Sequence, residues 1–258
     1  MSTPNSTKID RLKADARFAS LKRSLDVYYG DTDREIAMDA LYGRFLTKGA
    51  LAFDIGSHVG DRISSFRRQG ARVIALEPQP GCFEVLHELY CCDGAVTLLN
   101  SACGPRPGEL TLHINSANPT VTTASHAFIE AADGAGGWEG QIWDATITVP
   151  VTTLDELIAQ HGAPAFIKID VEGFEADVLM GLSRPVPALS FEFTTIQRDV
   201  AFNCLDRLRQ LGSFHFDIAL GESQSLTFGN WLSAEEMRRH IESLPHEANS
   251  GDVYAVLV

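Results

Sequence analysis

The sequence lacks the short motifs that would assign it to a zinc, redox or membrane class. Its five cysteines include no C-x-x-C pair and its eight histidines no H-E-x-x-H motif, which argues against thiol-redox chemistry and against a zinc hydrolase. No apolar run approaches the ~18 to 20 residues that cross a bilayer, and the first residues lack the apolar region of a secretory signal. We therefore expect a cytoplasmic protein with reduced thiols.

Basic residues are scarce relative to acidic ones. The chain has 21 Lys and Arg against 34 Asp and Glu, a formal net charge of −13. Because this charge repels polyanions, we expect no nucleic-acid partner and no membrane partner. The 258 residues, 45% of them hydrophobic, fit one α/β domain with additions.

Apolar periodicity divides the chain into two parts. Residues 1–49 show helical spacing, which predicts an N-terminal helical cap; pairing of two chains through these helices, giving a homodimer, is one option. From residue 50 to 258, short apolar runs alternate with helical segments, which predicts a mostly parallel sheet covered on both faces. We expect strands near 51–55, 72–76, 95–99, 165–170, 188–193, 214–219 and 252–257, with the direction of the last left open, and helices near 59–69, 81–90, 153–160, 174–181, 198–211 and 233–243.

Residues 115–145 interrupt this alternation with a Thr/Ser cluster and four glycines. A loop of this length in a compact domain is usually a lid, a binding loop or disordered, and we expect a lid-like insertion. Trp138 and Trp143 in this segment would either stack on a ligand or pack the loop. Tyr28 and Tyr29 of the cap would either cover a pocket or anchor a helix.

The strongest chemical signal follows the first predicted strand, in the run Asp54-Ile55-Gly56-Ser57-His58-Val59-Gly60. Glycines at 56 and 60 allow the backbone to pass close to a ligand, and the next helix presents free N–H groups. A dinucleotide site would read G-x-G-x-x-G; here an acidic Asp54 precedes G-x-x-x-G, which suits a cationic ligand better than a pyrophosphate. The second strand ends in Glu77, 23 residues after Asp54, where an acidic side chain accepts hydrogen bonds from ribose hydroxyls.

Together these features resemble class I S-adenosylmethionine-dependent methyltransferases. With Phe166-Ile167-Lys168-Ile169-Asp170-Val171-Glu172-Gly173-Phe174-Glu175, the resemblance narrows to the FkbM family and covers roughly residues 50–193. It implies a Rossmann-like seven-stranded fold, S-adenosylmethionine as cofactor, and methyl transfer to a hydroxyl of a sugar or secondary metabolite. It also implies a cofactor site made of Asp54, Gly56, Ser57, Gly60, Glu77, Pro78, Asn100, Ser101, Ala102 and Asp170. Asn100 stands where the commoner pattern has an acidic residue.

Candidates for the chemical step come from the ends of the fourth and fifth main strands. In this topology the two strands are neighbours, so Asp170 and Glu192 should lie near the cofactor. Three roles remain open: a general base, a divalent-metal site of Asp170 and Glu192 with or without Glu172, or acceptance by Asp170 or Glu172 of hydrogen bonds from the next helix's N–H groups. Lys168 alternates with Asp170; it would either lower the pKa of a carboxylate on its side of the strand or be a strand lysine whose ammonium extends to solvent.

Two histidines are further candidates for the base. His58 precedes a helix N-terminus, which favours the neutral form, although a capping or packing role is the alternative. His126 lies in the lid-like segment, where a plain surface histidine is the alternative.

The leading hypothesis is an S-adenosylmethionine-dependent O-methyltransferase that acts on a small molecule, with a divalent metal as an option only. Two alternatives remain. One is a non-catalytic binding or scaffold protein that keeps the fold, and the other is a nicotinamide-dependent oxidoreductase, which the missing middle glycine disfavours.

Overall fold

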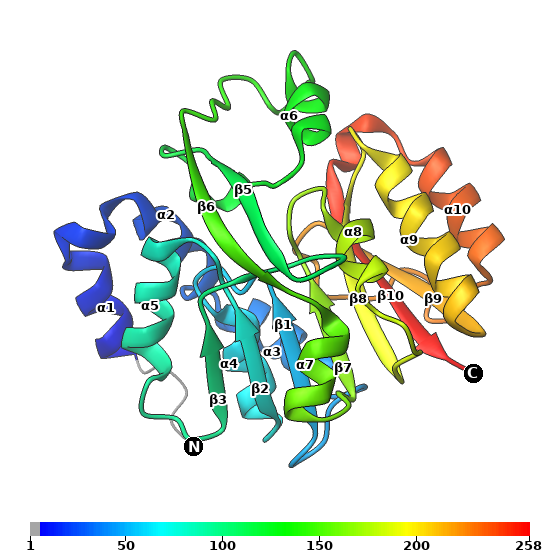
Figure 1. Cartoon of the computed structure of the whole chain (residues 1–258), viewed down its shortest axis with the longest axis horizontal. Coiled ribbons are helices and arrows are strands. Elements are labelled where there is room, and N and C mark those ends of the chain that lie inside the picture. Colours follow the sequence, from blue (N-terminus) through cyan, green and yellow to red (C-terminus); the bar gives the residue numbers. More distant parts are fainter. Residues whose placement is uncertain (1–5) are drawn as a thin grey trace.

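A seven-stranded sheet forms the centre of the molecule, in a computed structural model that describes residues 6–258 (Figure 1). The order is β3-β2-β1-β7-β8-β10-β9. All neighbours are parallel except those of β10, which runs antiparallel between β8 and β9. This confirms the predicted mostly parallel, Rossmann-like sheet. The strands are β1 (Leu51–Ile55), β2 (Arg72–Leu76), β3 (Val96–Leu99), β7 (Phe166–Ile169), β8 (Ala188–Thr194), β9 (Phe214–Leu220) and β10 (Ser250–Leu257).

Helices cover both faces of this sheet, and each face has its own apolar core. One core joins the sheet to the N-terminal helices and to the two helices that follow β1 and β2. The other joins it to four helices from the second half of the chain. The first set is α1 (Ser6–Ala14), the 3-10 helix η1 (Ala16–Leu21), α2 (Lys22–Tyr28), α3 (Thr32–Tyr42), α4 (Asp61–Arg68) and α5 (Pro80–Tyr90); the second is α7 (Leu154–His161), α8 (Glu175–Met180), α9 (Arg198–Leu211) and α10 (Ala234–Ser243).

The ends of these helices follow from local sequence. Thr153 and Glu156 form a reciprocal capping box at the start of α7, and Ser233 and Glu236 do the same for α10. All six helices predicted after residue 50 are found, with ends that differ by at most two residues. A further 3-10 turn, η3 (His246–Ala248), precedes β10.

A second, three-stranded sheet was missed by the sequence analysis. It consists of β4 (Ala102–Cys103), β5 (Gly108–Ile114) and β6 (Ala145–Thr152) in the order β4-β6-β5, and lies above the carboxyl ends of the central strands (Figure 1). Pro150 lies inside β6, and a proline in a run disfavours a strand. It is tolerated because β4 pairs only with residues 151 and 152 of β6, which leaves position 150 without a partner on that side.

The segment 115–145 connects β5 to β6 and contains two short helices, η2 (Pro119–Val121) and α6 (His126–Ala132). Its own small core contains Val121, Phe128 and Trp138. Trp143 donates a hydrogen bond through Nε1 to the Val121 carbonyl oxygen at 2.9 Å. Of the two roles considered for the tryptophans, the structure therefore shows packing within the segment.

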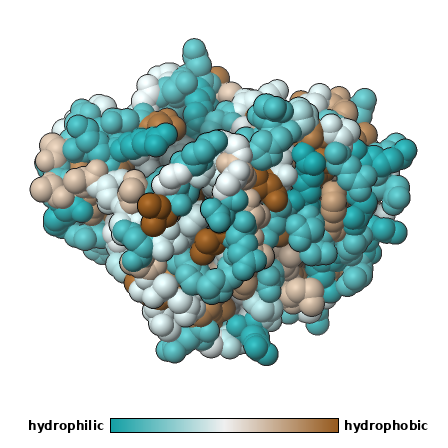
Figure 2. All heavy atoms as spheres, turned by 90° about the horizontal axis from the view of Figure 1, so that it is seen from above, coloured by the Kyte–Doolittle hydropathy of each residue, from teal (hydrophilic) through white to brown (hydrophobic). Residues whose placement is uncertain are grey.

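The face above the strand ends is largely hydrophilic, with apolar residues in small separate groups (Figure 2). None of the helices within residues 6–258 is long and apolar enough to span a bilayer.

Candidate active site

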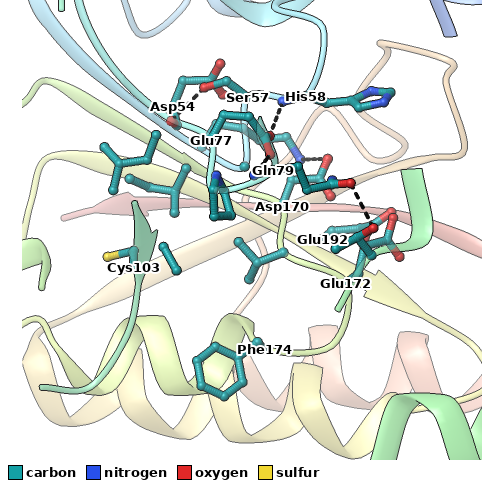
Figure 3. A pocket seen from close by; sticks show the side chains of 18 of the residues that line it. Asp54, Ser57, His58, Glu77, Gln79, Cys103, Asp170, Glu172, Phe174 and Glu192 are labelled. Carbon is teal, nitrogen blue, oxygen red and sulfur yellow. Dashed lines mark hydrogen bonds and ion pairs between the residues drawn. The ribbon is translucent and has the colours of Figure 1, made fainter. Parts of the chain in front are cut away.

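One large cavity lies where the central strands end beneath the small sheet (Figure 3). Its empty space amounts to about 1030 Å³, which includes open solvent at the mouth of the cavity. Carboxylates at the ends of β1, β2, β7 and β8 supply much of its polar lining. Its apolar wall consists of Leu76, Ala102, Cys103, Leu110, Leu112, Val171 and Phe174.

The turn after β1 brings two backbone segments into close contact. Gly56 has φ +84°, and a Cβ at this position would lie 1.8 Å from the Asp170 carbonyl oxygen, so only glycine fits. The Ser57 hydroxyl donates to the Asp54 carbonyl oxygen at 3.0 Å. The Asp54 carboxylate itself is buried, and no donor reaches either oxygen within residues 6–258. Burial raises its pKa to about 7.

Glu77 lies at the end of β2 and is held by two backbone groups. Its Oε2 accepts the N–H of His58 and its Oε1 accepts the N–H of Gln79, both at 2.8 Å. Burial outweighs these bonds and raises the pKa of Glu77 to about 8. Each carboxylate oxygen keeps further lone pairs for a ligand in the cavity.

Pro78, Ser101 and Ala102 line the same cavity as Glu77, but two other predicted cofactor residues do not. The Asn100 side-chain amide donates to the Glu77 carbonyl oxygen at 2.8 Å, so Asn100 positions the turn that carries Glu77. Gly60 faces α5, where a Cβ would lie 2.7 Å from Leu86 and from Tyr90. A glycine is required at position 60 because α5 packs closely against it, and not because a ligand contacts it.

A cluster of three carboxylates occupies another part of the cavity. Because Ile169 pairs with Phe191 in the parallel β7–β8 register, Asp170 and Glu192 follow side by side, as predicted. One oxygen each of Asp170, Glu172 and Glu192 lies within 4.8 Å of the others (Figure 3). We call these three residues the carboxylate cluster.

Lys168 controls the charge of this cluster. It is 1% exposed, and its Nζ lies 3.1 Å from Asp170 Oδ2 and also bonds Asp252. Burial opposes ionisation of Asp170, but the Lys168 and Arg62 cations hold its pKa below the ordinary value. Burial and then repulsion from Asp170 raise the pKa of Glu172 and of Glu192. The predicted influence of Lys168 on a neighbouring carboxylate is therefore confirmed.

Glu175, and neither of the two predicted acidic residues, accepts hydrogen bonds from the backbone N–H groups before α8. Glu175 accepts the N–H groups of Val171 and Gly173, at 3.0 and 3.3 Å. Neither Asp170 nor Glu172 has this role, so the side chains of both remain directed to the cavity.

Of the two candidate histidines, only His58 lines the cavity. Its ring meets Tyr28 edge-on, with centroids 5.7 Å apart, and burial lowers its pKa, which favours the neutral form. His126 begins α6, is exposed and lies against the His113 ring at 4.2 Å, outside the cavity. Tyr28 lines the cavity, whereas Tyr29 donates to the Val59 carbonyl oxygen at 2.8 Å and anchors α2.

Several residues of the site carried no signal in the sequence analysis. Thr122 donates to Gln79 Oε1 at 2.9 Å and ties the 115–145 segment to the start of α5. Glu222, in the loop after β9, bonds Arg34 of α3 at 2.7 Å, and Arg34 also bonds Asp61 at 2.8 Å. These contacts join segments far apart in sequence, so no local pattern marks them.

The residues present fit S-adenosylmethionine. Asp54 offers two buried, unpartnered oxygens for a cationic group, and Glu77 offers an oriented carboxylate for ribose hydroxyls. The close approach at Gly56 leaves no side chain in the way, and the apolar wall suits a planar base.

Comparison of the chain with known proteins identifies its family. The model of the methyltransferase FkbM domain matches residues 54–241, well over half of the chain. No curated protein matches. Similar solved structures include a TehB-like S-adenosylmethionine-dependent methyltransferase from Corynebacterium glutamicum, with 10% identity over 98% of this chain and 100% of that one and a TM-score of 0.48. An O-methyltransferase from Bacillus cereus in complex with S-adenosylhomocysteine is 11% identical over 99% of this chain and 92% of that one, with a TM-score of 0.45.

A precorrin-6y C5,15-methyltransferase from Geobacter metallireducens has 11% identity over 87% of each chain and a TM-score of 0.43. The family match covers both the turn with Asp54 and the β7 motif with Asp170, so it confirms the resemblance seen in the sequence. The chain belongs to the FkbM family of S-adenosylmethionine-dependent methyltransferases.

Proposed function

We propose that this enzyme transfers the methyl group of S-adenosylmethionine to a hydroxyl of a small molecule, such as a sugar or a secondary metabolite. The observation that carries the proposal is the carboxylate cluster, which shares one cavity with Glu77. Glu192 shares a side-chain hydrogen bond with Asp170, and within residues 6–258 no N–H group and no Ser, Thr or Tyr hydroxyl donates to the Glu172 or Glu192 carboxylate. These oxygens are therefore available to accept hydrogen bonds from an acceptor's O–H groups.

Binding of the cofactor would divide between two residues. Glu77 would hold the ribose hydroxyls and Asp54 would face the cationic methionine part, while Ser101 and Ala102 would border the base. When bound, S-adenosylmethionine supplies an electrophilic methyl group on a sulfonium. The protein's part is to orient the acceptor oxygen in line with that group and to keep water out.

The cluster would manage the proton. Methyl transfer forms a bond between the acceptor oxygen and the methyl carbon, the electrons of the broken bond remain on sulfur, and the hydroxyl proton must leave. Asp170 stays ionised beside Lys168, so it can accept a hydrogen bond from the hydroxyl. The released proton would then be taken up by Glu192 in its ionised form, which is the stronger base of the two because its pKa is raised.

The proposal is tested with matched acceptors. The purified full chain and S-adenosylmethionine are incubated with trios of sugars or polyketide alcohols that carry a hydroxyl, a hydrogen or an amine at one position. Mass spectrometry detects the added methyl group, and nuclear magnetic resonance locates it. An O-methyl product supports the proposal, and methylation of nitrogen or carbon alone contradicts it. Cofactor binding without turnover on any acceptor would favour the non-catalytic alternative.

A further inference from the structure

The carboxylate cluster has the spacing of ligands around one metal ion. One oxygen from each of Asp170, Glu172 and Glu192 lies within 4.8 Å of the other two. Oxygens that share a divalent ion bond it at about 2.0 to 2.6 Å, so they lie at most about 5 Å apart. The three side chains come from the ends of β7 and β8 and from the turn before α8, which are rigidly joined by the sheet register.

The protein compensates the charges of this cluster only in part: Lys168 pairs with Asp170, which also shares a hydrogen bond with Glu192. Glu172 is only 9% exposed. Lys168, the ammonium that contacts the cluster, bonds Asp170 and is shared with Asp252. In the part of the chain that the structure describes, the side-chain oxygens of Glu172 receive no hydrogen bond from any N–H group or hydroxyl. Glu172 is buried and Asp170 and Glu192 are half-buried, and carboxylates this close together are costly unless a cation or protons compensate them.

An independent observation beside the cluster also indicates a ligand. Gln197, in the loop before α9, is 8% exposed, and its Oε1 has no donor among residues 6–258. That oxygen lies against Gly173, where a Cβ would be 2.7 Å away, and Gln197 and Glu192 line the same small hollow. This unpartnered oxygen can therefore accept a hydrogen bond from a water or bind a cation on the Glu192 side of the cluster.

We infer that Asp170, Glu172 and Glu192 bind a divalent cation with a preference for oxygen ligands, such as Mg²⁺, Mn²⁺ or Ca²⁺, and that Gln197 Oε1 completes the site directly or through a water. The donor set is made only of carboxylate and amide oxygens, which selects these ions over Zn²⁺ or Cu²⁺. The ion would neutralise the cluster and leave positions open toward the cavity.

The role of this cation rests on the proposed function, whereas its binding does not. In the cavity, an acceptor hydroxyl on the ion would lose its proton more easily and would be held near the methyl group. An acceptor with two neighbouring oxygens would be favoured, because both could contact the ion.

Binding is tested without cofactor or acceptor. The full chain, treated with chelator, is titrated with Mn²⁺, and electron paramagnetic resonance measures the free ion. We expect one Mn²⁺ per chain with a Kd of about 10⁻⁵ to 10⁻³ M, displaced by Mg²⁺ or Ca²⁺. Glu172→Gln and Glu192→Gln should each weaken binding about tenfold or more. Glu109→Gln, an exposed glutamate on β5 beside the cavity wall, is the matched control and should bind as wild type does.

Absence of saturable Mn²⁺ binding by the wild-type chain overturns the inference, as does binding that neither cluster variant weakens. Circular dichroism checks that the variants fold. If they do not, the thermal midpoint of wild type decides: the site predicts a saturable rise with Mg²⁺ but not with Na⁺ of equal ionic strength, and no rise overturns it. Calorimetry with S-adenosylmethionine on the same samples distinguishes a failed metal site from a failed methyltransferase assignment.

Discussion

The Glu77 carboxylate accepts the backbone N–H of His58 at 2.8 Å, so the end of β2 is tied to the turn that follows β1. The same carboxylate accepts the N–H of Gln79, which begins the approach to α5. One acidic side chain therefore fixes two turns of the cofactor site and still faces the cavity. Its burial gives it an unusual response to pH.

Stability should fall as pH rises through the pKa of Glu77. Burial raises this pKa from 4.5 to about 8, so the folded state holds a proton that the unfolded state releases. The favourable contribution is fully present below about pH 4.5 and is lost by about pH 8, a change of a few kcal/mol. Urea unfolding from pH 5 to 9 measures it.

Glu77→Gln is the comparison, because glutamine has no such proton to lose. Asp54, with its pKa raised to about 7, adds a slope of the same sign in both proteins. As pH rises from 5 to 9, the free energy of unfolding of the wild type should therefore fall by a few kcal/mol relative to that of Glu77→Gln. Parallel curves would contradict the raised pKa of Glu77.

The close contact at Gly56 predicts a large effect of one methyl group. Gly56→Ala would place a Cβ 1.8 Å from the Asp170 carbonyl oxygen at a φ of +84°. Gly137 has the same φ of +84° with nothing within 4 Å, so Gly137→Ala isolates the backbone strain. We expect the control to cost about 1 to 2 kcal/mol of unfolding free energy and Gly56→Ala at least about 3. Equal costs in denaturant titrations would rule out the steric contact.

Lys168 should be essential to the fold as well as to the cluster. Lys168→Met removes the ammonium that pairs with Asp170 and Asp252, and leaves Asp252 buried without it. We expect a loss of about 3 to 5 kcal/mol, because an uncompensated buried charge remains. The double variant with Asp252→Asn should recover part of that loss in a double-mutant cycle. Additive losses would show that the pair is not coupled.

Glu192 should affect the chemical step more than the cofactor. Glu192→Gln keeps the shape of the side chain but removes its capacity to take a proton. We expect kcat to fall about 10² to 10⁴-fold, with the Kd for S-adenosylmethionine changed by no more than about twofold. Rapid-quench assays and calorimetry give the two values. A large loss of cofactor affinity with little change in kcat would contradict a role of Glu192 in the chemical step and would indicate that it binds the cofactor.

Much of the fold followed from local patterns because the central strands are short apolar runs separated by helical segments. Glu77, Asp170 and Glu192 were placed correctly for a topological reason: the carboxyl ends of parallel strands meet at one edge of the sheet. The small sheet was missed because β6 contains Pro150 and its strands are half-exposed.

The remaining errors concern side-chain direction, which sequence does not specify. His126 belongs to the expected segment but does not line the cavity, and the Asn100 side chain turns back to hold the Glu77 backbone. Glu222 reaches the cavity from a loop distant in sequence, and Gln197 reaches the hollow beside Glu192 from the loop that follows β8. Only the tertiary fold brings them there.

Calorimetric titration of the folded chain with S-adenosylmethionine and with S-adenosylhomocysteine, for wild type and Glu77→Ala, tests the central claim most directly. The account predicts one site per chain with micromolar affinity for both ligands, roughly −8 kcal/mol, and a loss of at least about tenfold in the variant. Glu109→Gln should bind both ligands as wild type does. No binding by the folded wild-type chain, or equal binding by Glu77→Ala, would contradict the assignment of this cavity to the cofactor.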